Sequence, residues 1–251
     1  MSRNRRKKIL ATPQSDPVLE AVAEKFVDHV PAEIKHATYD GGSRHEFREA
    51  LQVRTQAIAI GIPFDELSFS QFTVNLLGLH IMPWDMLITT MSTYLPMARN
   101  QIHNIFIENK DQGTHLLMLD SDVLAPPDII NTLLAHNKPM VGGYYRKKEK
   151  YPIKKPDGSI EIVQRPVVYD YSDEKSGFIQ RVFPGTGLER VDGAGAGCWL
   201  MRRDAAEAIG KSPYGEDVGE DLVLCHKITE AGFEMWIDWS MACAHIGSFW
   251  V

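Results

Sequence analysis

The amino-acid sequence predicts an α/β fold in which a mostly parallel central sheet is covered by helices on both faces. Two observations lead to this prediction. Between residues 55 and 145, four short apolar segments of strand length alternate with three segments of helical length. Such alternation is typical of doubly wound sheets built from β-α-β units. Beyond residue 196 the chain adds two further strand-length segments and two helical ones, so the same pattern returns there.

The first strand is expected at residues 55–63. This segment contains the apolar run AIAIGI, which is typical of a buried strand. Pro63 stops the strand, because proline lacks an N–H and restricts the residue before it. The segment that follows, up to Leu79, is predicted to be helical.

The next strands and helices follow from the same two patterns. Strands are expected where apolar residues run together, at 85–91, 115–120 and 138–145. Helices are expected at 96–109 and 128–137, and in the second of these apolar residues recur at helical spacing. Pro96 and the pair Pro126-Pro127 lie near the first turns of these helices, where a missing N–H costs nothing.

The alternation breaks after residue 145. Residues 146–190 are rich in Lys, Pro, Gly and Asp and contain short β-type runs, which predicts a loop-rich insertion or a small antiparallel patch. Regular structure then resumes, with strands expected at 197–203 and 233–238, a short helix at 204–209, and a helix at 219–230 that Gly232 closes.

Residues 1–54 are interpreted as an N-terminal extension to a domain at 55–251. The extension is polar and interrupted by prolines, and its stretch 18–30 has the apolar spacing of an amphipathic helix. Five of its first eight residues are Arg or Lys. They could form an arm that binds nucleic acid or another acidic surface, or they could be a solvated terminus.

Composition narrows the class of protein. Of 251 residues, 44% are hydrophobic and 24% are charged, which is ordinary globular usage. No apolar run approaches the roughly 18 residues that cross a bilayer, and no signal peptide is recognised, so no integral membrane association is expected. Three cysteines, an odd number, favour a reducing cytoplasm and are interpreted as core residues. The net charge of −6 argues against a nucleic-acid binder with a broad basic surface.

The stretch THLLMLDSDVLAPPD, residues 114–128, carries the clearest chemical signal. Four apolar residues, Leu116 to Leu119, end on the carboxylates of Asp120 and Asp122. Ionised groups are costly at the end of a buried strand unless they are compensated, and two such oxygens suit a hard divalent cation such as Mg²⁺ or Mn²⁺. The alternative is that one Asp caps the next helix and the other is a solvated turn residue.

Four segments of the sequence together resemble one family. LLMLDSDVLAPPDIINTLLAHNKPMVGGYY is similar to the central segment of nucleotide-sugar glycosyltransferases of the GT-A fold, in which an apolar strand delivers a D-x-D motif to a metal-bound sugar nucleotide. MARNQIHNIF resembles the helix before that motif, and GAGAGCWLMRRDAAEAIG the glycine-rich loop, strand and short helix after it. GEDLVLCHKITEAGFEMWIDWSMACAHIG resembles the family's Glu-Asp helix and closing His. The resemblance covers residues 55–247 and implies a GT-A domain, with a nucleoside-diphosphate sugar as donor substrate.

The resemblance also implies a metal site. Asp122 corresponds to the direct ligand of Mn²⁺ or Mg²⁺, and Asp120 lies nearer the ribose or shares the metal through water. His245 corresponds to the histidine that completes the metal shell in many relatives. Without the D-x-D motif, a histidine beside Ala and Ile is better explained as a hydrogen-bonded core residue.

In inverting relatives the Asp of the Glu-Asp pair is the general base, so Asp221 is the expected catalytic base and Glu220 a ligand of the acceptor. Carboxylates in a first helical turn are also stabilised by the helix dipole alone. A second pair, Glu216-Asp217, lies four residues earlier. The spacing downstream fits the family better from Glu220, and we adopt that register.

Other donor-binding residues follow from the same correspondence. Arg99 contacts the donor phosphates or else pairs with a carboxylate. Pro63 and Asp65 end the first strand, where relatives bind the nucleotide base. Gly195, in the loop GAGAG, lets the backbone approach the donor sugar or is part of a plain turn. Residues 144–148 clamp donor or acceptor, or form a solvated basic turn.

The sequence thus predicts a cytoplasmic, metal-dependent glycosyltransferase that moves a sugar from a nucleoside diphosphate to an acceptor hydroxyl, with inversion. The acceptor is left open among DNA, protein and glycan, as is the oligomeric state. Two alternatives remain at this point. A nucleotidyltransferase could use a related sheet and carboxylates, although a glycine-rich basic loop after the first strand is missing. A non-catalytic protein that binds sugar or nucleic acid could use the basic segments.

Overall fold

The structure is a computed structural model that describes residues 54–64, 68–92, 94–215 and 219–247. Three sequence predictions lie outside these residues: the helix at 18–30, Asp65, and the pair Glu216-Asp217. Within the described part of the chain, no helix has both the length and the apolar character needed to cross a membrane.

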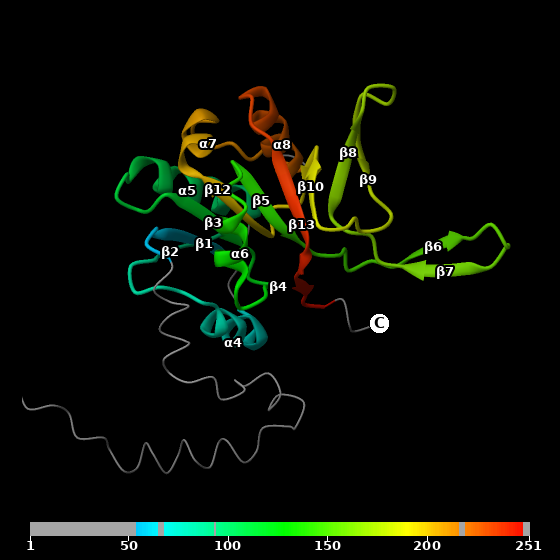
Figure 1. Cartoon of the computed structure of the whole chain (residues 1–251), viewed down its shortest axis with the longest axis horizontal. Coiled ribbons are helices and arrows are strands. Elements are labelled where there is room, and N and C mark those ends of the chain that lie inside the picture. Colours follow the sequence, from blue (N-terminus) through cyan, green and yellow to red (C-terminus); the bar gives the residue numbers. More distant parts are fainter. Residues whose placement is uncertain (1–53, 65–67, 93, 216–218, 248–251) are drawn as a thin grey trace, which may run out of the picture. The chain divides into compact units, whose positions relative to one another are not determined.

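A seven-stranded sheet forms the centre of the domain, with the strand order β10-β13-β5-β12-β3-β1-β2 (Figure 1). Five strands run in the same direction, and β12 and β10 run opposite to them. The predicted mostly parallel sheet is therefore confirmed. Its strands are β1 (Ile58–Phe64), β2 (Met86–Met91), β3 (His115–Leu119), β5 (Met140–Tyr144), β10 (Leu188–Val191), β12 (Cys198–Arg202) and β13 (Met235–Ala242).

Helices cover both faces of this sheet, as predicted. One face carries α5 (Leu95–Glu108), α7 (Arg203–Ala208) and α8 (Glu220–Glu230), and the other carries α4 (Ser70–Gly78) and α6 (Ile129–Ala135). The strands supply alternate side chains to the two cores. In β3, for example, Leu116 and Met118 pack with α5, whereas Leu117 and Leu119 pack with α6. Because both faces are covered, the strand has to be apolar throughout.

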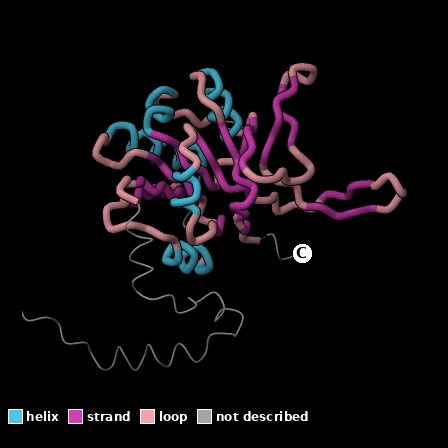
Figure 2. Tube along the Cα trace, viewed as in Figure 1, coloured by secondary structure: helices cyan, strands magenta, loops and turns pink. Residues whose placement is uncertain are grey.

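The segment between β5 and β12 is the predicted insertion, and it consists of short antiparallel strands (Figure 2). β6 (Tyr151–Lys154) and β7 (Ile160–Val163) form one hairpin. β8 (Val168–Ser172) and β9 (Gly177–Gln180) form a second, and β11 (Gly193–Ala194) pairs with β8. Another strand of this segment, β10, instead joins the edge of the central sheet beside β13.

A separate pair of very short strands brings the end of the domain back to β3. β4 (Val123–Leu124) follows the Asp-Ser-Asp turn, and β14 (Ala244–His245) pairs with it antiparallel. The N–H of Ile246 donates to the carbonyl of Asp122 at 2.8 Å. This pairing places His245 next to the turn.

Candidate active site

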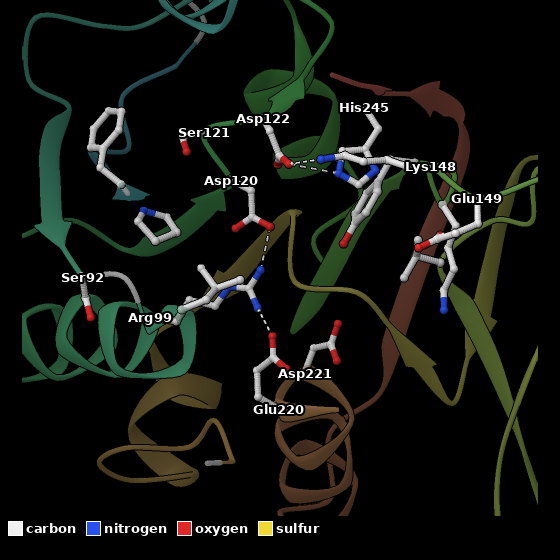
Figure 3. A pocket seen from close by; sticks show the side chains of 16 residues that line it. Ser92, Arg99, Asp120, Ser121, Asp122, Lys148, Glu149, Glu220, Asp221 and His245 are labelled. Carbon is white, nitrogen blue, oxygen red and sulfur yellow. Dashed lines mark hydrogen bonds and ion pairs between the residues drawn. The ribbon is translucent and has the colours of Figure 1, made fainter. Parts of the chain in front are cut away.

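A cavity of about 480 Å³ lies at the carboxyl ends of β1, β3 and β5, the edge at which open α/β sheets bind ligands. Its walls come from the end of β1, the turn after β3, the loop after β5, and the first turns of α5 and α8 (Figure 3). The cavity is lined by most of the residues predicted from the sequence: Pro63, Arg99, Asp120, Asp122, Glu220, Asp221 and His245.

The Asp-Ser-Asp turn is closed by backbone hydrogen bonds. The N–H of Asp120 donates to the carbonyl of Gly197 at 2.9 Å, and the N–H of Val123 donates to the carbonyl of Asp120 at 3.0 Å. The following helix, α6, has Asp128 at its N-cap and receives no side-chain cap. The capping alternative for Asp120 and Asp122 is therefore wrong.

Arg99 links the turn to the start of α8. Its guanidinium, buried in α5, donates to Asp120 Oδ2 at 2.6 Å and to Glu220 Oε1 at 2.7 Å (Figure 3). Burial disfavours the charged guanidinium and is the largest single effect, but Asp120 and the other acidic groups nearby together outweigh it, and the pKa of Arg99 is raised. Of the two alternatives for Arg99, the structure contains the pairing with carboxylates.

Asp120 is held on one side only. Its Oδ2 accepts the hydrogen bond from Arg99, whereas its buried Oδ1 has no hydrogen-bond partner among the described residues. Burial raises the pKa of this carboxyl group; Arg99 opposes the rise and Asp122 adds to it. A buried oxygen without a partner costs about 1–3 kcal/mol. Asp120 therefore has an acceptor available for a ligand hydroxyl.

Asp122 and His245 meet at the mouth of the turn. His245 Nδ1 lies 2.9 Å from the carbonyl oxygen of Arg146, and Nε2 lies 3.2 Å from Asp122 Oδ2. Because a carbonyl oxygen only accepts, Nδ1 carries a proton and Nε2 is the nitrogen turned toward the carboxylate. Histidines that bind metals are commonly oriented by such a backbone acceptor.

Lys148 contacts the same carboxylate, with its Nζ 2.7 Å from Asp122 Oδ2. Burial alone would raise the pKa of Asp122, but the interactions with His245 and Lys148 together outweigh it and lower the pKa to about 2. Asp122 is therefore ionised at neutral pH and already has a positively charged neighbour.

The three predicted metal ligands do not form one cluster. Among the residues that the structure describes, no group of three or more His, Cys, Asp or Glu side chains is placed to hold a metal ion. Asp122 and His245 offer an oxygen and a nitrogen on one side, whereas Asp120 faces Arg99. This donor set fits Mg²⁺ or Mn²⁺ only where substrate phosphates and water supply the other ligands, as is usual for Mg²⁺.

The first turn of α8 brings two carboxylates to the opposite wall. Gly219 lies at the N-cap with φ of 90°, a conformation that glycine adopts readily. Glu220 is bound by Arg99, and Asp221 Oδ1 accepts from the N–H of Leu222 at 3.1 Å. Burial raises the pKa of Asp221; Arg99 opposes the rise and Glu220 adds to it.

Gly195 lies behind the cavity wall. A Cβ at this position would overlap the hydroxyl of Tyr145 and the side chain of Val167, and both of these residues line the cavity. The close approach that requires glycine here is thus to Tyr145. The N–H of Gly197 also donates to the Tyr145 hydroxyl at 3.1 Å.

Sequence reasoning did not single out some of the lining residues. Ser92 follows β2, and its position at a strand end was a usable signal. Val167 and Glu149 come from the insertion, where no motif marks them.

The fold resembles that of solved structures, although no family model and no curated protein sequence matches the chain. The crystal structure of A197 from STIV aligns with a TM-score of 0.53 and 17% identity, covering 76% of this chain and 85% of that one. GalNAc-T7, solved with UDP, GalNAc and Mn²⁺, aligns with a TM-score of 0.53 and 10% identity, covering 76% of this chain. The alignment spans only 43% of the GalNAc-T7 chain. The domain has the GT-A type of fold that the sequence predicts.

Proposed function

We propose that the chain is a metal-dependent glycosyltransferase that moves a sugar from a nucleoside-diphosphate sugar to an acceptor hydroxyl, with inversion. The observation that carries the proposal is the meeting of the Asp-Ser-Asp turn, His245 and the Glu-Asp start of α8 around one cavity. The likeness in fold to GalNAc-T7, which was solved with UDP, GalNAc and Mn²⁺, supports the same class of donor and metal.

On the donor side, Asp122 and His245 would hold Mn²⁺ or Mg²⁺ together with the donor's diphosphate. A bound metal supplies Lewis-acid stabilisation of the negative charge that the leaving diphosphate acquires. Asp120 is fixed by Arg99, and its unpaired Oδ1 accepts a hydroxyl of the donor. Arg99 also orients Glu220, so one buried cation positions both walls of the cavity.

On the acceptor side, Asp221 acts as the general base. The acceptor oxygen attacks the anomeric carbon, the bond from that carbon to the diphosphate oxygen breaks, and the hydroxyl proton passes to Asp221. A pKa raised by burial makes the carboxylate a stronger proton acceptor. Glu220, held by Arg99, accepts a second hydrogen bond from the acceptor.

The pH dependence of turnover is expected to report Asp221. The base acts only when ionised, and burial raises its pKa above the roughly 3.9 of a free aspartate. The value of kcat should therefore decline as the pH is lowered through this raised pKa, and the acid limb should be absent from Asp221→Asn. A limb at the same pH in that variant would assign the titration to another group.

Donor binding is tested by thermal unfolding with a panel of nucleoside-diphosphate sugars, with Mn²⁺, with Mg²⁺ and with chelator. A ligand at about 100 times its Kd stabilises the native state by about 2.7 kcal/mol, so a raised Tm with one nucleotide and metal is expected. Asp122→Ala should lose the dependence on metal. If no donor raises the Tm while nucleic acid does so in a salt-sensitive way, the chain is a binding protein.

A further inference from the structure

Lys148 contacts the carboxylate oxygen of Asp122 that a metal ion would bind. Its Nζ and Nε2 of His245 both contact Oδ2 of Asp122, at 2.7 Å and 3.2 Å (Figure 3). The pair is partly open to solvent, since the side chains of Lys148 and Asp122 are 41% and 27% exposed. A divalent cation bound to this oxygen would repel an ammonium group on the same atom, so the two compete for it.

The backbone around Lys148 is fixed, and its side chain is long enough to move. The amide of Gln164 donates to the carbonyls of Lys147 and Lys148 at 3.1 Å and 3.2 Å, and the N–H of Lys147 donates to the carbonyl of Arg165 at 2.9 Å. Lys148 also lines the cavity. An ammonium group displaced from Asp122 would therefore stay in the cavity. Its strongest anionic partner there would be the donor's diphosphate.

We propose that Lys148 holds the place of the metal ion on Asp122 in the free protein and moves to the donor's diphosphate when the metal binds. This inference rests on the proposed function and adds that the binding of metal and the binding of diphosphate are coupled. Metal alone binds weakly, because it must leave Lys148 without a partner. Metal and diphosphate together bind more tightly, because the displaced ammonium gains a phosphate partner.

The test is the affinity of the full chain for Mn²⁺ alone, measured from the spin-resonance signal of free Mn²⁺. Wild type is compared with Lys148→Met, with Lys148→Ala as a second variant, and with Lys154→Met as the matched control. Lys154 is exposed on β6 and does not line the cavity. Both Lys148 variants are expected to bind Mn²⁺ roughly tenfold more tightly than wild type, the scale for removing one competing charge at a partly exposed site.

A second readout follows the displaced ammonium. At saturating Mn²⁺, inorganic pyrophosphate should raise the Tm of wild type and of Lys154→Met, and this rise should be clearly smaller in both Lys148 variants. If wild type binds Mn²⁺ and the Lys148 variants bind it no more tightly, the inference is wrong and the proposed function stands. If neither wild type nor the variants bind Mn²⁺ alone, the inference is wrong. If none of them binds Mn²⁺ in the presence of pyrophosphate either, the metal part of the proposed function fails as well.

Discussion

Replacing Asp221 with asparagine is expected to lower turnover by about 10²–10⁴-fold, the usual contribution of a general base. Asparagine keeps the size of the side chain but cannot take the proton of the acceptor hydroxyl. In the proposed function, donor and metal are bound at the opposite wall by Asp120, Asp122 and His245, so metal-dependent donor affinity should be unchanged. The measurements are kcat at saturating donor and donor affinity by calorimetry.

Asp217→Asn is the matched control for this substitution, because the pair Glu216-Asp217 offers the same two residue types four positions earlier. Asp217→Asn is expected to retain near wild-type turnover. Full turnover in Asp221→Asn, combined with its loss in Asp217→Asn, would move the functional pair to the earlier position.

The second large effect is expected on stability. Arg99→Met should lower the free energy of unfolding by about 3–5 kcal/mol, because it leaves the buried carboxylate of Asp120 and the partner carboxylate of Glu220 without their shared cation. Methionine fills much of the space of the arginine stem, so the loss is mainly electrostatic. Urea unfolding at neutral pH in the presence of chelator measures it.

Arg190→Met is the control for Arg99→Met. Arg190 pairs with Glu234 at 3.5 Å, with the two side chains 58% and 49% exposed, and such surface pairs contribute about 0–1 kcal/mol. The loss in Arg99→Met should also shrink as the pH is lowered. Arg99 is the charge that lowers the pKa of Asp120, so without it this carboxyl protonates at a higher pH. A cost similar to that of Arg190→Met would contradict a central role for Arg99.

The sequence predicts the elements whose burial is encoded locally. Because β3 packs on both faces, its apolar run is continuous, and the strand expected at 115–120 is observed as His115–Leu119. The antiparallel direction of β12 and its place between β3 and β5 could not be predicted from the local sequence. They depend on pairing with distant strands, which no local pattern carries, and the same is true of β10 at the edge of the sheet.

In the candidate site, too, some residues can be predicted from the sequence, whereas their contacts depend on the assembled fold. Two carboxylates at the end of a buried strand can be recognised from the sequence as candidate site residues, because their desolvation is costly unless a cation or a hydrogen-bond donor compensates it. The contact between Arg99 and Glu220 joins residues 121 positions apart, and Lys148 reaches Asp122 from a loop after a different strand. Which charges compensate each other is decided by the assembled sheet, so the sequence left the partner of Arg99 open.

The two-residue pairing of β4 with β14 has a consequence for how the molecule is assayed. His245 lies outside the seven-stranded sheet, in a strand that pairs with β4 over only two residues. Opening so short a pairing costs much less free energy than unfolding the whole domain. The imidazole can leave Asp122 while every strand of the sheet remains paired. Without ligand, a melting curve therefore reports the integrity of the sheet, and hydrogen exchange at the amide of Ile246 reports whether the site is assembled.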